Sequence, residues 1–296
     1  MIPKVKFYDL SAAGRKILNE NEVCTFYFDR DNLKARGGMS HIHEQTLLSG
    51  RKVATKGLPS DKPLNPENVF YIANEAKALC ELSQVKSHPN IIEYYGLVRL
   101  GERPYVVMEL LDEPQDQSSR SLGSPLPVEE VLTIGLGIAK GLHHVHKHGL
   151  THRDVKPSNF VGDKLIDFAF CWKNGQPIVV DGHQHSSGTP GYFSPAILGG
   201  SEPTIQDDIY SYGVALFEML SGKAALPPGT DPVISRNILG SKIADLAICR
   251  GLTPEIAELL FATTQTTPEF GVMRENGFFT SCRDIVRFIK TLINVD

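Results

Sequence analysis

The sequence lacks several features that would direct a function assignment. No apolar run is long enough to span a membrane, and the first ten residues, M-I-P-K-V-K-F-Y-D-L, lack the apolar core of a signal peptide. The formal net charge is -4, so there is no basic excess of the kind that a nucleic-acid partner requires. The five cysteines include no C-x-x-C pair, which favours free thiols in a reducing compartment. We therefore expect a cytoplasmic protein with no integral membrane segment and no nucleic-acid partner.

The composition is that of an ordinary globular chain. Hydrophobic residues make up 41% and charged residues 22% of the 296 residues. This length is enough for one large domain or for two lobes that share a cleft. No internal repeat is present. The function must therefore be sought in local motifs.

One short stretch, T-H-R-D-V-K-P-S-N at residues 151–159, carries the parts of a reaction centre. Asp154 is a base, Lys156 a cation and Asn159 an oxygen ligand, all on one loop. Phosphoryl transfer needs such parts, because its catalysis is mostly positioning and charge neutralisation. The stretch resembles the catalytic loop of a eukaryotic-type protein kinase, H-R-D-x-K-P-x-N.

The resemblance extends over roughly residues 33–293 and implies a fold. The expected architecture is α+β and two-lobed, with a small β-rich N-lobe and a larger α-helical C-lobe. By this resemblance, residues 33–111 form the N-lobe and residues 112–296 the C-lobe of one catalytic domain. Residues 1–32 would be an N-terminal extension.

The resemblance also implies roles for the polar residues of the C-lobe. Asp154 would accept or orient the proton of the substrate hydroxyl, and Lys156 would neutralise charge on the transferring phosphate. Asn159 and Asp167, in L-I-D-F-A, would hold Mg²⁺. Ala169 stands where the family has the glycine of D-F-G, and a Cβ at unusual backbone angles would cost roughly 1 kcal/mol.

Two charged residues of the N-lobe match a further family motif. Residues 53–56, V-A-T-K, resemble the strand whose lysine reaches the α- and β-phosphates, which makes Lys56 a candidate catalytic residue. Residues 69–82 have the apolar spacing of a helix, and Glu75 lies on it. The resemblance pairs Glu75 with Lys56. The alternatives, a surface lysine and a solvated glutamate, are less favoured because the two residues stand at the family spacing.

The ATP-binding residues are implied by the same resemblance. Residues 35–42, A-R-G-G-M-S-H-I, stand where the family has its glycine-rich loop, with Ala35 and Ser40 in place of two glycines. The strand at residues 105–111 would lead into the hinge. The implied ATP contacts are Ala35, Gly37, Gly38, Ile42, Ala54, Lys56, Met108, Glu109 and Leu111.

A segment before the C-terminal helices resembles the family's activation segment. Gly188–Tyr192, G-T-P-G-Y, resembles the G-T-P-x-Y stretch that holds a protein substrate, and it contains Thr189. Arg153 could receive a phosphate placed on Ser186 or Ser187, although these serines could equally be plain loop residues. The implied partners are a protein substrate and a regulatory protein.

Two positions of the family's structural ion pair also differ. Ala196 replaces the glutamate of A-P-E, and Phe279 stands near the place of its arginine partner. Loss of both partners leaves no buried charge unpaired. Arg274 or Arg283 could take the role of that arginine.

The remaining pattern is mainly helical. Residues 128–148, 253–263 and 282–293 are expected to form helices, and residues 11–19 and 23–28 a short helix and a strand. His144 and His148 stand four residues apart, but no further metal ligand is near, so a solvated helix face is expected there.

Three functions fit these motifs to different degrees. The first is an ATP-dependent serine/threonine protein kinase, since a lysine two residues after the aspartate is typical of that class. The alternative is a pseudokinase that binds nucleotide or a partner, for which the departures at Ala35, Ser40, Ala169 and Ala196 speak. A small-molecule kinase of the antibiotic-phosphotransferase kind would lack the G-T-P-x-Y segment.

Overall fold

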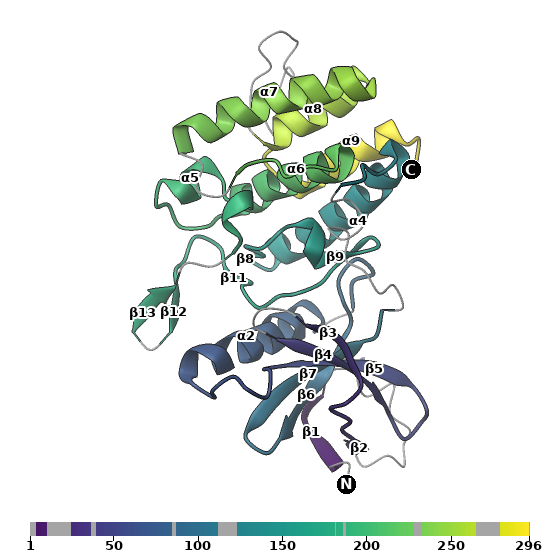
Figure 1. The fold of residues 1–296 in the computed structure, drawn as a ribbon, viewed down its shortest axis with the longest axis vertical. Helices are drawn as coiled ribbons and strands as arrows, with labels where there is room; N and C mark the ends of the chain where they lie inside the picture. Colours follow the sequence, from purple (N-terminus) through teal and green to yellow (C-terminus); the bar gives the residue numbers. More distant parts are fainter. Residues whose placement is uncertain are drawn as a thin grey trace. The chain divides into compact units, whose positions relative to one another are not determined.

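The structure is a computed structural model in which two compact units are described (Figure 1). The first unit comprises Met1–Pro114, Asp167–Cys171 and Val179–His185, and the second comprises Gln115–Ile166, Trp172–Ile178 and Ser186–Asp296. The described residues are 4–10, 25–36, 40–84, 87–111, 123–180, 182–185, 188–227, 232–264 and 279–295.

The first unit is built on an antiparallel sheet in the order β2-β1-β6-β7-β5-β4-β3. Its strands are β1 (Lys4–Leu10), β2 (Thr25–Tyr27), β3 (Leu33–Arg36), β4 (His41–Thr46), β5 (Lys52–Gly57), β6 (Tyr94–Leu100) and β7 (Arg103–Glu109). The strand expected at residues 23–28 is confirmed as β2. Strand β1 was not foreseen, although K-V-K-F-Y-D-L begins with the alternation of a half-buried strand. The first residues therefore extend the sheet beyond β6.

One apolar cluster supports the strands of the first unit. Phe28, Val53, Tyr105 and Val107 are among its fully buried members. Gly57 on β5 is required here, because a Cβ at this position would lie 2.3 Å from the Tyr105 ring. This close approach fixes the pairing of β5 with β7, which carries the predicted V-A-T-K motif.

The helix expected at residues 69–82 is α2 (Pro66–Leu82), which packs against β6 and β7. It begins three residues earlier than predicted, because the Asn65 side chain accepts from the Asn68 N–H and Pro66 occupies the first turn. The buried face of α2 includes Asn74 and Glu75. Two polar residues therefore lie on the inner side of this helix.

The second unit is helical (Figure 1). Its helices are α4 (Val128–Lys147), α5 (Pro195–Leu198), α6 (Ile205–Ser221), α7 (Pro232–Arg250), α8 (Pro254–Thr263) and α9 (Cys282–Leu292). The three helices predicted in this half of the chain are confirmed as α4, α8 and α9. The sequence analysis missed α7, whose apolar periodicity is interrupted by polar residues and Gly240.

Helix α6 is the centre of the second unit. It packs against α4 and α8, and all its residues from Asp207 to Leu220 are buried. A capping box formed by Thr204 and Asp207 starts the helix. Near its middle, the Tyr212 hydroxyl donates to the Gly135 carbonyl of α4 at 3.0 Å. This bond joins the middle of α6 to α4.

Short two-stranded sheets lie in the middle of the chain. Strand β8 (Leu150–Thr151) pairs with β11 (Trp172–Lys173), and β9 (Phe160–Val161) pairs with β10 (Lys164–Leu165). The β9–β10 turn contains Gly162 at a φ of 56°, in the left-handed region that glycine adopts readily. Strands β12 (Ile178–Val180) and β13 (His183–His185) form another two-stranded sheet.

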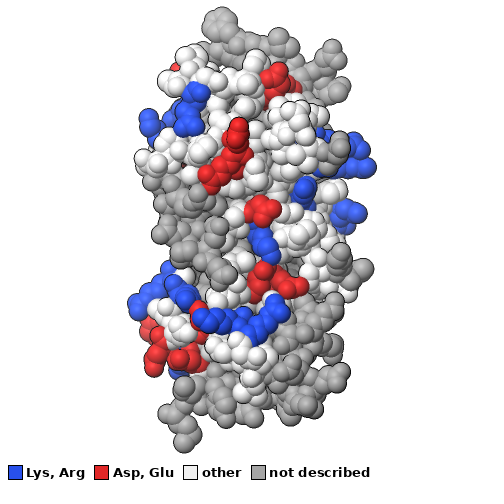
Figure 2. All heavy atoms as spheres, turned by 90° about the vertical axis from the view of Figure 1, so that its right-hand side faces the viewer, with Lys and Arg blue, Asp and Glu red and all other residues white. Residues whose placement is uncertain are grey.

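Charged side chains of both signs are interspersed on the face shown in Figure 2. Of the helices within the described ranges, none combines the length and the apolar character needed to cross a bilayer.

Candidate active site

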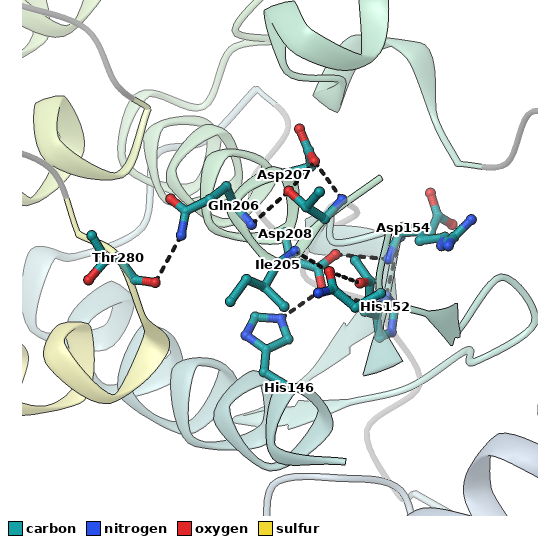
Figure 3. A network of polar contacts seen from close by, with 12 residues as sticks. His146, His152, Asp154, Ile205, Gln206, Asp207, Asp208 and Thr280 are labelled. Carbon is teal, nitrogen blue, oxygen red and sulfur yellow. Dashed lines mark hydrogen bonds and ion pairs between the residues drawn. The ribbon is translucent and has the colours of Figure 1, made fainter. Parts of the chain in front are cut away.

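The loop that carries Asp154 is held by one buried carboxylate of helix α6. Asp208 accepts the N–H of His152 at 2.7 Å and the N–H of Arg153 at 2.8 Å (Figure 3). Arg153 has a φ of 70°, in the left-handed region that a non-glycine residue adopts only under constraint. The two hydrogen bonds to Asp208 provide such a constraint immediately before Asp154.

His146 of α4 supplies the positive charge that this carboxylate needs. Its Nε2 lies 2.9 Å from Asp208 Oδ2, and the two side chains are 7% and 1% exposed. Burial lowers the pKa of His146, but Cys282 and Asp208 raise it more strongly, to about 10. His148 is exposed, as expected, whereas His146, which lies between His144 and His148 in the sequence, has a buried side chain. The role of His146 follows from its contact with Asp208. The sequence does not reveal this contact, because the two residues lie 62 positions apart.

Four polar side chains converge at the catalytic loop itself. The Asn159 Nδ2 donates to the Asp154 carbonyl at 2.7 Å and to Asp154 Oδ2 at 2.9 Å. The Lys156 Nζ lies 2.8 Å from Asp154 Oδ2. Thr189 Oγ1 donates to Asp154 Oδ1 and accepts from Lys156 Nζ, both at 2.7 Å. A base, a cation and a hydroxyl thus lie in mutual contact within the second unit.

A second charged cluster lies in the first unit. Lys56 Nζ is 2.9 Å from both carboxylate oxygens of Glu75 and 2.8 Å from Asp167 Oδ1. Burial lowers the pKa of Lys56, but the charges of Asp167 and Glu75 outweigh this effect and raise it above the ordinary value. Lys56 is therefore a cation at neutral pH. The structure brings together the lysine, the glutamate and the aspartate that the sequence motifs singled out.

Asp167, not Ala169, has the unusual backbone in this segment. Asp167 has a φ of 61°, whereas Ala169 is not among the described non-glycine residues of positive φ. The cost predicted for a Cβ at Ala169 is therefore wrong, because that residue avoids the left-handed region. The strain lies in the backbone of Asp167.

The residues expected around ATP follow the strands of the first unit. Ala35 of β3 pairs with Ile42 of β4, and Ile42 pairs with Lys56 of β5. Ala54 pairs with the buried Met108 of β7.

The hinge end of β7 is also described. The Glu109 N–H donates to the Glu93 carbonyl at 2.9 Å, so this N–H is engaged within the unit. Leu111 is the last residue described before residue 123 and is partly buried. Gly37 and Gly38 lie outside the described residues.

The segment after Thr189 is attached to α6 by side chains that the sequence analysis missed. The Tyr192 hydroxyl donates to Glu218, the Ser194 hydroxyl donates to Asp207, and Ser211 Oγ donates to the Tyr192 carbonyl at 2.8 Å. These bonds attach the segment to α6. Ala196 cannot contribute an ion pair, because it carries no charge.

The two positions of the missing ion pair carry no charge. Ala196 is exposed, and Phe279 is buried with its ring against Phe288, the ring centroids 5.5 Å apart. Arg283 is exposed on α9, and Arg274 lies outside the described residues. The apolar contact of Phe279 replaces a buried charge with packing.

The residues expected to take part in switching are only partly described. The Arg153 guanidinium donates from Nη2 to the carbonyls of Lys173, at 2.8 Å, and Gln176, at 2.5 Å. It therefore braces the β11 turn. Ser186 and Ser187 lie outside the described residues.

Comparison with known proteins adds a family to this geometry. The family model described as protein kinase domain matches residues 35–296. A probable serine/threonine-protein kinase PknB of Lactococcus lactis is 29% identical over 76% of this chain, and a probable serine/threonine-protein kinase PBL28 of Arabidopsis thaliana is 31% identical over 71%. Serine/threonine-protein kinase PLK4 of Nematostella vectensis is 26% identical over 80%. The matches cover 36%, 58% and 24% of these relatives, so the chain spans less than two thirds of their length.

Proposed function

This chain belongs to the protein kinase domain family, and on that premise we propose that it transfers the γ-phosphate of ATP to serine or threonine hydroxyls of a protein substrate. The observation that carries the proposal is the contact of Asp154 with Lys156 and Thr189 at 2.7 to 2.8 Å. In this arrangement the Thr189 hydroxyl lies within hydrogen-bonding distance of both the base, Asp154, and the cation, Lys156.

In this proposal the second unit carries out the proton and phosphate steps. Asp154 orients the substrate hydroxyl and accepts its proton, and Asn159 fixes the Asp154 carboxylate through its amide nitrogen. Lys156 places a positive charge beside the same carboxylate and neutralises charge on the transferring group. The substrate hydroxyl would replace the Thr189 hydroxyl as the hydrogen-bond partner of Asp154.

The first unit supplies the cation for the nucleotide phosphates. Lys56 is fixed by Glu75, which is fully buried, so its ammonium group is held in place before a nucleotide binds. Ile42, Ala54 and Met108 would line the adenine, with the backbone of Glu109 and Leu111 at its edge. These residues lie on paired strands: Ile42 of β4 pairs with Lys56 of β5, and Ala54 of β5 pairs with Met108 of β7.

Each unit has an oxygen donor of the kind that Mg²⁺ prefers, Asp167 in the first unit and Asn159 in the second. Among the described residues, no group of three or more His, Cys, Asp and Glu side chains could hold a metal by itself. Mg²⁺ in phosphoryl-transfer sites is bound by one or two carboxylates together with phosphate oxygens, so a full protein cage is not needed. When bound, Mg²⁺ would neutralise charge on the phosphate oxygens. Asp167 would offer a carboxylate whose side chain is 36% exposed.

The pseudokinase alternative is not favoured. Lys56, Glu75, Asp154, Asn159 and Asp167 are all present, and relatives at about 30% identity carry serine/threonine kinase names. We also propose a reducing, cytoplasmic compartment, which is supported by the free thiols of Cys249 and Cys282.

The test is phosphoamino-acid analysis of a generic protein substrate after incubation with γ-labelled ATP and Mg²⁺. We expect label on serine and threonine. A product that carries mainly phosphotyrosine, or no labelled product, would contradict the proposal. Lys156→Ala should reduce the label strongly, because the cation beside Asp154 is lost.

A further inference from the structure

Asn74 of helix α2 is a buried polar residue that the proposed chemistry does not use. It precedes Glu75, and its side chain is almost fully buried, with the residue 5% exposed. Its Nδ2 donates to the Ala169 carbonyl at 2.8 Å and to the Cys171 carbonyl at 2.9 Å. All three residues belong to the first unit. We propose that Asn74 is a positioning residue that holds the Asp167–Cys171 segment so that the Asp167 carboxylate is presented for metal binding.

The segment needs such a support because its first residue is strained. Asp167 has a φ of 61°, in the left-handed region that is unfavourable for a non-glycine residue. Asp167 is also tied to Lys56 at 2.8 Å, which fixes one of its carboxylate oxygens. Unless the following residues are held as well, the backbone could relax out of this conformation.

Helix α2 holds the segment at three places. Glu75 Oε1 accepts the Phe168 N–H at 3.2 Å, and Asn74 donates to the carbonyls of Ala169 and Cys171. Within the segment, the Cys171 N–H donates to the Phe168 carbonyl at 3.0 Å. The helix therefore contacts both donors and acceptors of this turn, through two adjacent side chains.

The chemistry of the amide explains why this position is asparagine. One NH₂ group supplies two donors in a fixed plane, which suits two carbonyl oxygens that lie close together. An aspartate would turn acceptors toward the same carbonyls, and an aliphatic residue would leave both carbonyls without this donor. The carboxylate of the neighbouring Glu75 already meets the N–H of Phe168. The Asn74–Glu75 pair is thus matched to the polarity of the segment.

The inference rests on the proposed function for its effect on Mg²⁺, but its structural part is testable alone. The variants are Asn74→Ala and Asn74→Leu, which both remove the donors while the leucine keeps a side chain of similar volume. Asn68→Ala is the matched control on the same helix, because the Asn68 Nδ2 donates to the Pro63 carbonyl at 2.9 Å. Hydrogen exchange would be followed in a peptide covering residues 167–172.

Loss of the two bonds should speed exchange of the Phe168 and Cys171 amides roughly tenfold in both Asn74 variants. The half-saturating Mg²⁺ concentration for phosphate transfer should rise by a similar factor, with a smaller change in the apparent KM for the protein substrate. Asn68→Ala should leave both quantities at the wild-type value.

The outcomes separate this inference from the proposed function. Unchanged exchange of the segment in both Asn74 variants would overturn the inference, whatever the activity. Faster exchange with an unchanged Mg²⁺ requirement would overturn the link to metal binding. If the Asn74 variants exchange faster but the wild type transfers no phosphate, the positioning role is supported and the proposed function is contradicted. If Asn74→Ala does not fold, the same comparison is made with Asn74→Leu.

Discussion

The buried pair of His146 and Asp208 predicts how the second unit responds to pH. The folded-state pKa of His146 is raised from 6.5 to about 10. Its charge therefore stabilises the fold fully below the unfolded pKa, and this contribution is lost as the pH rises through about 10. Between about pH 6 and about pH 9 the wild type should lose roughly 3 kcal/mol from this group alone. The pKa of Asp208 is lowered, so its own contribution is lost only in acid.

His146→Leu should remove this dependence. At about pH 6 the variant should be less stable by roughly 3 to 5 kcal/mol, because a buried carboxylate loses its cation. Near pH 9 the difference should shrink, since the wild-type imidazole is by then partly neutral. A loss of 3 kcal/mol corresponds to a melting shift of roughly 6 to 12 °C for a unit of this size.

The assay uses the single tryptophan of the chain. Trp172 lies on β11, paired with Thr151 next to the catalytic loop, so its fluorescence reports unfolding of the second unit. His148→Leu is the matched control, because His148 is exposed on the same stretch of chain. If wild type and His146→Leu change their melting midpoints equally between the two pH values, the assigned role of His146 is wrong.

Three further predictions concern the reaction. Thr189→Val should lower turnover roughly ten- to hundredfold, because the hydroxyl that accepts from the Lys156 Nζ at 2.7 Å is lost, and steady-state kinetics at saturating ATP would measure it; an unchanged rate would refute that role. Mg-ATP at a hundredfold excess over its Kd should stabilise the wild type by about 2.7 kcal/mol, and Lys56→Met should abolish this shift in a melting scan. Joint replacement of Ser186 and Ser187 with alanine should lower the rate to that of phosphatase-treated wild type; equal rates in all samples would exclude a switch at these serines.

The sequence predicts those parts of the site that lie on local motifs. The catalytic loop could be located because Asp154, Lys156 and Asn159 lie within six residues of one another. The helix that carries Glu75 could be located from its apolar spacing. Their spacing is imposed by the chemistry of phosphate transfer. The Lys56–Glu75 contact at 2.9 Å could be anticipated only through the family resemblance.

What the sequence does not predict are contacts between residues distant along the chain. His146 and Asp208 stand 62 positions apart, and Asn74 and Ala169 stand 95 apart. No periodicity distinguishes these residues from others on their helices. The place of β1 in the sheet was missed for a similar reason, because its partner β6 lies far along the chain.

The most direct test of the proposed kinase activity is phosphate transfer by Asp154→Asn beside the wild type. The substitution keeps the shape of a side chain that contacts Lys156, Asn159 and Thr189 but removes its basicity. We expect γ-phosphate transfer by the wild type and a loss of roughly two to four orders of magnitude in the variant, with ATP affinity nearly unchanged. Equal transfer by both proteins, or none by the wild type, would contradict the account.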